Sequence, residues 1–149
     1  MQHLHLRDRP GAPPWGHQRH KRLTASVFLT VAGDEIPSPS LLGNPRFLDR
    51  VERAAATGLV RLRRTLSLMA FLEEAERFTD KLRLGPPPVL RVLHQLRAKD
   101  VHVAQGMFGR SLFAVPLNAA ARRQLLAKLE SLKLRAAEIP VAPRGAEVL

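Results

Sequence analysis

The sequence of 149 residues contains no cysteine. It can therefore form no disulfide, no cysteine-ligated zinc site and no thiol nucleophile. No apolar run approaches the roughly 20 residues that a membrane-spanning helix needs, and the N-terminus lacks the apolar core of a signal peptide. These absences predict a cytoplasmic protein that does not enter a membrane.

Acidic residues are scarce, with 13 Asp and Glu against 24 Lys and Arg, so the formal net charge is +11. This excess predicts a polyanionic partner, with nucleic acid first and an acidic protein or a membrane surface second. Most of the cations are arginines, whose planar guanidinium suits phosphates and base edges. A GC-rich genome would also enrich Arg, Ala, Leu and Pro. The composition alone therefore does not decide whether a polyanionic partner or the genome accounts for the many arginines.

Catalytic motifs are missing as well. No glycine-rich phosphate loop follows a predicted strand, and "TVAGDE" (residues 30–35) lacks the spacing of a Walker or dinucleotide motif. The sequence indicates no Ser, His and Asp residues that would form a catalytic triad. The histidines at positions 3, 5, 17 and 20 have no carboxylate or cysteine at matching spacing. We therefore predict no cofactor, no metal and no catalysis by this chain alone.

Composition divides the chain into four segments. We expect a disordered basic tail at 1–22, a strand and a proline-rich linker at 23–45, a basic α/β domain at 46–135, and a loose tail at 136–149. The strand is predicted at 25–32, where β-branched residues are frequent.

Two helices are predicted in the first part of the domain. Asn44 and Pro45 form a helix entry, and Gly58 is expected to end that helix. The next helix is predicted over 59–78, which places Arg61, Arg63 and Arg64 in its first turns. Because cations there oppose the helix dipole, a role in binding would explain them.

The stretch 85–115 combines a helix with a hairpin. Pro86–Pro88 favour a helix start, and Val89, Leu93 and Leu96 recur at the spacing of a buried stripe. Strands are predicted at 101–104 and 111–115, joined by the turn "QGMFGR". Asn118 is expected to cap a last helix. This order predicts a small α+β, winged-helix-like domain.

In a winged helix, the last helix and the hairpin face nucleic acid. Arginine can contact phosphate or guanine, and glutamine can read adenine. Phe108 at the hairpin tip would stack on an unpaired base or, alternatively, pack back on the core. The predicted nucleic-acid-binding residues are Arg61, Arg63, Arg64, Arg91, His94, Gln95, Arg97, Lys99, Phe108, Arg110, Arg122 and Arg123.

Two segments, "LLGNPRFLDRVERA" (41–54) and "FTDKLRLGPPPVLRVLHQLRAKDVHVA" (78–104), carry a family resemblance. Their order resembles the C-terminal domain of the tRNA guanosine N2,N2-dimethyltransferase family, in which paired prolines precede a Leu/Val helix and a strand. The methyl-donor domain and catalytic Asp-Pro-Phe motif of that family have no match here. The resemblance therefore implies a tRNA-binding module without methyl transfer.

The leading hypothesis is thus a detached or truncated module that binds structured RNA, most plausibly tRNA. One alternative is a winged-helix DNA-binding transcriptional regulator. Another is a protein-interaction or assembly module with no nucleic-acid role. Besides nucleic acid, these hypotheses imply a second binding partner, which would be either another protein or a missing catalytic domain.

Overall fold

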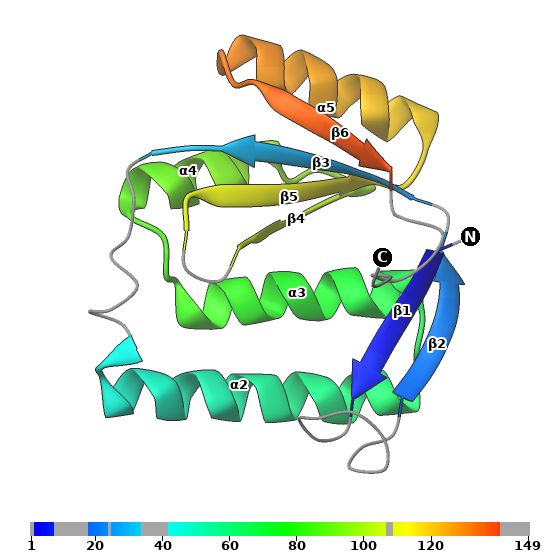
Figure 1. The fold of residues 1–149 in the computed structure, drawn as a ribbon. Coiled ribbons are helices and arrows are strands. Elements are labelled where there is room, and N and C mark those ends of the chain that lie inside the picture. Colours follow the sequence, from blue (N-terminus) through cyan, green and yellow to red (C-terminus); the bar gives the residue numbers. More distant parts are fainter. Residues whose placement is uncertain (1, 8–17, 24, 34–41, 107–108, 141–149) are drawn as a thin grey trace, which may run out of the picture.

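The computed structural model describes residues 2–7, 18–23, 25–33, 42–106 and 109–140, with backbone alone in the first two ranges. Its described part is an α+β fold with four helices, a four-stranded antiparallel sheet and a separate two-stranded ribbon (Figure 1). Within these ranges, no helix combines the length and hydropathy needed to cross a membrane.

The ribbon pairs β1 (Gln2–Arg7) with β2 (Gln18–Leu23). The sheet has the order β4-β5-β3-β6, and every neighbouring pair is antiparallel. Its strands are β3 (Ser26–Val31), β4 (Val101–Gln105), β5 (Ser111–Pro116) and β6 (Ala136–Pro140). The helices are α2 (Pro45–Arg64), α3 (Leu68–Leu82), α4 (Pro87–Leu96) and α5 (Ala119–Ser131).

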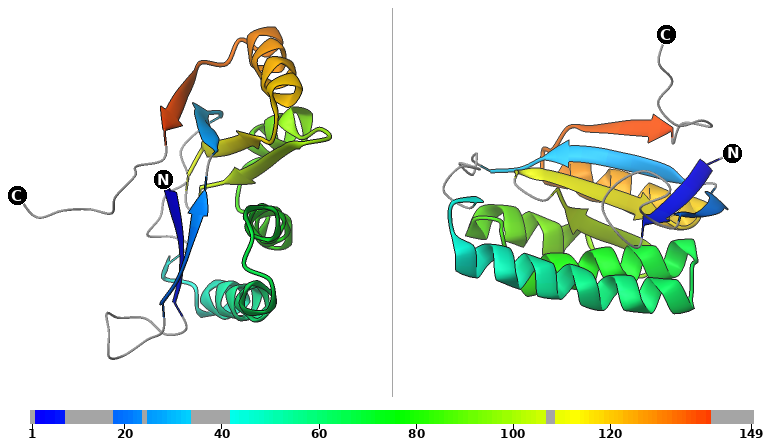
Figure 2. Two further views of the ribbon diagram at one scale, coloured as in Figure 1. Left: turned by 90° about the vertical axis from the view of Figure 1, so that its right-hand side faces the viewer. Right: turned by 60° about the horizontal axis from the view of Figure 1, so that its bottom comes forward.

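One face of the sheet carries the main core. Side chains alternate between the two faces of a strand, and the buried positions of β3, β4 and β5 meet α4 and α5 on the same face, as Figure 2 shows from two directions. The predicted stripe of α4 is confirmed, because Val89 and Leu93 have no exposed surface and Leu96 is 2% exposed. The remaining core residues are Phe28, Ala32, Val101, Val103, Leu112, Ala114, Ala121, Leu125 and Leu129.

The predicted boundary between the first two helices was wrong. Helix α2 runs through Gly58 without interruption and ends at Arg64, with Thr65 as its C-cap, and Ser67 then caps α3 by accepting a hydrogen bond from the Ala70 amide. A single glycine inside a helix costs only about 1 kcal/mol, which the packing of α2 against α3 can offset. The arginines at 61, 63 and 64 consequently lie in the last turn of α2, where cations favour the helix dipole.

Both termini differ from the predicted tails. Strands β1 and β2 lie within segments expected to be disordered or linking, and β6 pairs with β3 along its whole length. All five residues of β6 are exposed, so its sequence lacks the apolar alternation that marks a half-buried strand. Backbone hydrogen bonding, which does not depend on side-chain polarity, forms these strands.

The winged-helix detail of the expectation is not confirmed. The β4–β5 hairpin belongs to a four-stranded sheet, in which β5 pairs with β3 and β3 with β6. The coarser expectation of an α+β domain is confirmed, with α3 packed beside the edge strand β4 and α2 packed on α3.

Candidate functional site

The structure does not gather the predicted binding residues on one surface. The arginine group of α2 and the pair Arg122 and Arg123 of α5 lie at opposite ends of the molecule (Figures 1 and 2). The exposed Arg91, His94 and Gln95 lie on α4, between these ends, and Lys99 is exposed just after it.

Several of these cations are engaged in ion pairs within the fold. Arg61 Nη1 lies 3.0 Å from Oε2 of Glu74, which links α2 to α3. Arg122 donates to both carboxylate oxygens of Glu138, with its Nη2 2.6 Å from Oε2, and thereby ties α5 to β6. Hydrogen bonding to Glu138 raises the pKa of Arg122 above its ordinary value, and the pair lowers the pKa of Glu138.

Arg97 is a structural residue in this fold. Its Nε donates to the Val103 carbonyl at 3.0 Å, and its Nη1 lies 2.9 Å from each carboxylate oxygen of Asp80. Only 19% of its side chain is exposed. The guanidinium therefore joins α4 and β4 to α3 and does not lie on the outward face where the sequence pattern placed it.

The remaining predicted hairpin residues have different outcomes. Phe108 lies outside the described residues, so its stacking role stays a prediction. Arg110 is exposed just before β5, and its Nη1 donates to the Gly33 carbonyl at 3.3 Å. A guanidinium has five N–H donors, and Gly33 is the one acceptor found for them among the described residues. The other N–H donors of Arg110 are therefore available to an anion.

Glycines from three separate connections lie at the end of the sheet that carries Arg110. The end of β3 carries Gly33, the α3–α4 connection carries Gly85, and the β4–β5 turn carries Gly106 and Gly109. These segments lie at the same end of the sheet, on the left in Figure 1. We call Gly33, Gly85, Gly106, Gly109 and Arg110 the glycine end.

Gly33 is a glycine for two reasons. Its φ of +72° falls in the left-handed region, which costs other residues about 1–2 kcal/mol. A Cβ at this position would also lie 2.7 Å from Cγ2 of Val89, in the first turn of α4. The end of β3 therefore approaches the N-terminus of α4, which no side chain caps.

Gln105 connects the other glycines. Its Nε2 donates to the Gly109 carbonyl at 2.7 Å, and a Cβ on Gly85 would lie 2.9 Å from its Oε1. That Oε1 is buried and has no hydrogen-bond partner among the described residues.

The arrangement is suited to an anion. Glycines let a ligand approach the backbone closely, and Arg110 adds a cation whose donors are mostly unused. The sequence signal was the pair of glycines in "QGMFGR". It was missed because the partners Gly33 and Gly85 are far away along the chain.

Comparison with solved structures finds a similar fold. The chain matches a protein described as "Phosphotransferase related to CoA biosynthesis pathway", with a TM-score of 0.71 at 19% sequence identity. The match covers 93% of this chain and 45% of that protein, so this chain spans about half the length of its structural neighbour. No protein-family model matches the sequence, and no curated protein matches it either.

This likeness overturns the resemblance to the tRNA guanosine methyltransferase family. The fold is similar to part of that solved structure, and the motifs at 41–54 and 78–104 do not mark a tRNA-binding C-terminal domain. The nucleic-acid-binding function was therefore wrong, both as an RNA-binding module and as a DNA-binding regulator. Amphipathic helices that begin with proline and are followed by a strand occur in many folds. So short a pattern therefore does not identify a family.

Proposed function

We propose that this chain contributes one half of a small-molecule phosphotransferase, and that its glycine end contacts the phosphate groups. The observation that carries the proposal is the convergence of four glycines and Arg110 at one end of the sheet, in a fold similar to a phosphotransferase. The reaction class is that of this structural neighbour.

The reaction would move a phosphoryl group from a phosphoanhydride donor to a hydroxyl of the acceptor. The bond from phosphorus to the donor's bridging oxygen breaks, the acceptor oxygen forms the new bond, and the hydroxyl proton passes to a base. Positioned cations and backbone N–H groups stabilise the charge on the phosphoryl oxygens in such transfers. Arg110 is the cation that we assign to this role, and its bond to Gly33 would hold it in place.

We propose further that the reaction requires a complementary part, in the same polypeptide or in another. The structural neighbour is about twice as long as the matched region. The outer face of the sheet also leaves large apolar side chains uncovered, with Val31 48% exposed, Phe113 41% and Ile139 39%. Exposed apolar patches mark interaction surfaces. A cytoplasmic location stays a prediction.

The proposal is tested by titrating the chain with inorganic triphosphate and following backbone amide shifts by NMR. We expect the shifts to concentrate at Gly33, Gly106 and Gly109. Arg110→Gln should weaken binding about tenfold, because a charged hydrogen bond contributes about 1.5–3 kcal/mol.

Arg123→Gln is the matched control, since it removes the same charge from an exposed site on α5. It should leave the affinity within about twofold, because exposed charges at a distance are screened by salt. Equal weakening by both substitutions, or shifts spread over all the cations, would show a general attraction of polyanions to a basic protein and would refute the assignment.

A further inference from the structure

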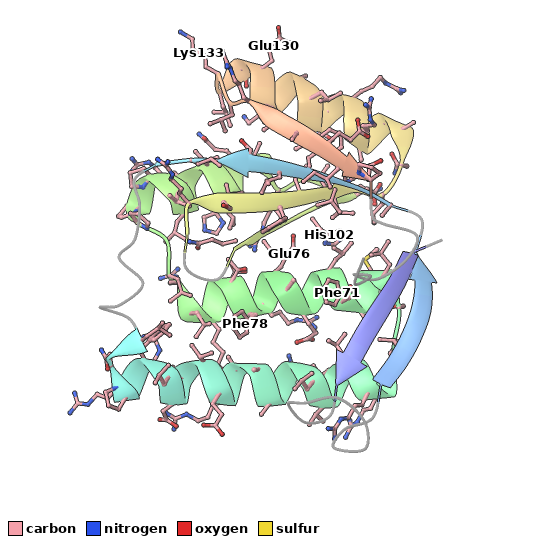
Figure 3. All side chains as sticks on the ribbon, viewed as in Figure 1. Phe71, Glu76, Phe78, His102, Glu130 and Lys133 are labelled. Atoms are coloured by element: carbon pink, nitrogen blue, oxygen red, sulfur yellow. The ribbon has the colours of Figure 1, made fainter. Side chains whose placement is uncertain are left out.

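A groove lies between α2 and α3, away from the glycine end. Its volume is about 440 Å³, within the range of about 300–1,000 Å³ that is usual for small-molecule sites. Small residues of α2, including Ala54, Ala55 and Gly58, provide the space. Phe71 and Phe78 of α3 also line the groove, and Figure 3 shows Phe78 on the side of α3 that faces α2.

The apolar lining is incompletely covered. Phe71 is 39% exposed although it borders the groove, and Val60 and Met69 near the same end of the helices are 50% and 41% exposed. Two helices packed only for stability would bury an aromatic ring of this size, because that burial contributes about 1.5–3 kcal/mol. The exposed ring therefore marks a surface that an apolar group can cover.

The rim of the groove is cationic. Arg61, Arg77 and Lys81 line it together with one carboxylate, that of Glu74. Glu74 is buried and bonds to both Arg61 and Arg77, and hydrogen bonding to Glu74 raises the pKa of Arg77 further above its ordinary value. Lys81 is exposed and pairs with no described carboxylate. The groove therefore has a surplus of positive charge, and its one carboxylate is already neutralised.

We propose that this groove binds an amphipathic anion, with an aliphatic body against Phe71 and Phe78 and a carboxylate or phosphate head near Lys81. The charge surplus selects an anionic head over a cationic one, and the apolar lining selects a ligand with a hydrocarbon chain over a bare anion. This site goes beyond the proposed phosphoryl transfer, because it concerns different residues and needs no complementary part.

Octanoate is the probe, and its binding to the chain is measured by NMR shift perturbation. Octyltrimethylammonium matches the hydrocarbon chain with the opposite charge, and acetate supplies the head without the chain. We expect octanoate to bind about tenfold more tightly than either, with shifts confined to α2 and α3. Two results would overturn the proposal. One is octyltrimethylammonium binding as tightly as octanoate, and the other is no detectable binding of octanoate at about 10 mM.

Matched substitutions locate the ligand. Ala55→Leu fills the groove and should weaken octanoate binding about tenfold, since overpacking costs about 1–3 kcal/mol. Ala56→Leu adds the same group to the exposed side of α2, outside the groove, and should have less than about a twofold effect. Lys81→Gln should weaken binding about two- to fivefold, whereas Lys99→Gln, which removes an exposed charge elsewhere, should not.

Thermal unfolding of each variant checks that the fold is retained, and sedimentation checks for association. If Ala55→Leu abolished self-association of the chain and octanoate did not bind, the groove would be a contact between two copies and the ligand assignment would be wrong. Phosphate or triphosphate binding at the glycine end is measured separately, so failure of either assignment leaves the other testable.

Discussion

Asp80 and Arg97 join α3 to the end of α4, with Nη1 of Arg97 lying 2.9 Å from each carboxylate oxygen of Asp80. Arg97 caps α4 and also donates to Val103 of β4, so one guanidinium connects three elements. Glu76 reinforces the same junction, because its Oε1 accepts from the Val103 amide at 2.8 Å and its Oε2 lies 3.2 Å from Nδ1 of His102 (Figure 3).

Arg97→Met should lower the free energy of unfolding by about 1.5–3 kcal/mol, because it removes charge-assisted hydrogen bonds and leaves their acceptors unpaired. Asp80→Asn should cost less, since Asp80 is 48% exposed and the bond to Val103 survives. Urea denaturation measures both effects. Arg91→Met is the control, because Arg91 is exposed on the same helix. Equal losses at positions 91 and 97 would contradict the structural role of Arg97.

Gly33→Ala should destabilise the fold by about 1–3 kcal/mol, because the added methyl combines a left-handed backbone with a close contact to Val89. Gly109→Ala is the matched control at the same end of the sheet. There a Cβ would lie 3.7 Å from its nearest neighbour, an ordinary contact. Thermal unfolding followed by circular dichroism compares the two, and a Gly33 variant as stable as the Gly109 variant would refute the described geometry.

Gly58→Ala should stabilise the protein by about 0.5–1 kcal/mol, because alanine favours the interior of a helix over glycine. The added Cβ would lie 3.4 Å from Oε2 of Glu74, at the edge of ordinary contact. The measurement is again urea denaturation, with Ala56→Gly on the exposed side of α2 expected to cost a similar amount. A loss of stability in Gly58→Ala would support a helix end at this glycine instead of a continuous α2.

The attachment of β6 should depend on pH through Glu138. Hydrogen bonding to Arg122, and then to Ser26, lowers the pKa of Glu138 in the folded state. A carboxyl whose pKa is lowered by folding contributes stability above its unfolded pKa, and this contribution is lost as the pH falls through the folded value. The Arg122–Glu138 contact should therefore be complete at neutral pH and should break in acid.

Hydrogen exchange of the β6 amides measures this change. Protection relative to the core amides of β5 should fall as the pH is lowered through the acidic range. Glu138→Gln should show reduced protection already at neutral pH and no further step in acid. A step that persists in this variant would have to come from another carboxyl.

Local patterns in the sequence were sufficient for much of the fold. The strand around Phe28, the helix started by Pro87 and the helix capped by Asn118 all follow short-range rules of alternation, periodicity and capping. The sequence also signalled the break between α2 and α3, because Ser67 is a typical helix-capping residue. Gly58 was the stronger local signal for a helix end, and it was misleading. Strand β6 carried no apolar pattern at all.

The candidate sites depended on contacts that are distant in sequence. The apolar periodicity by itself determined which faces of α4 and α5 are buried, because burial of these faces is required in any compact fold. Only the tertiary structure decided that Arg97 joins α4 to α3 and that Arg110 donates to the segment after β3, since the acceptors Asp80 and Gly33 belong to other elements. The approach of Gly33 to Val89 and of Gly85 to Gln105 was likewise decided by chain packing, which no local pattern encodes.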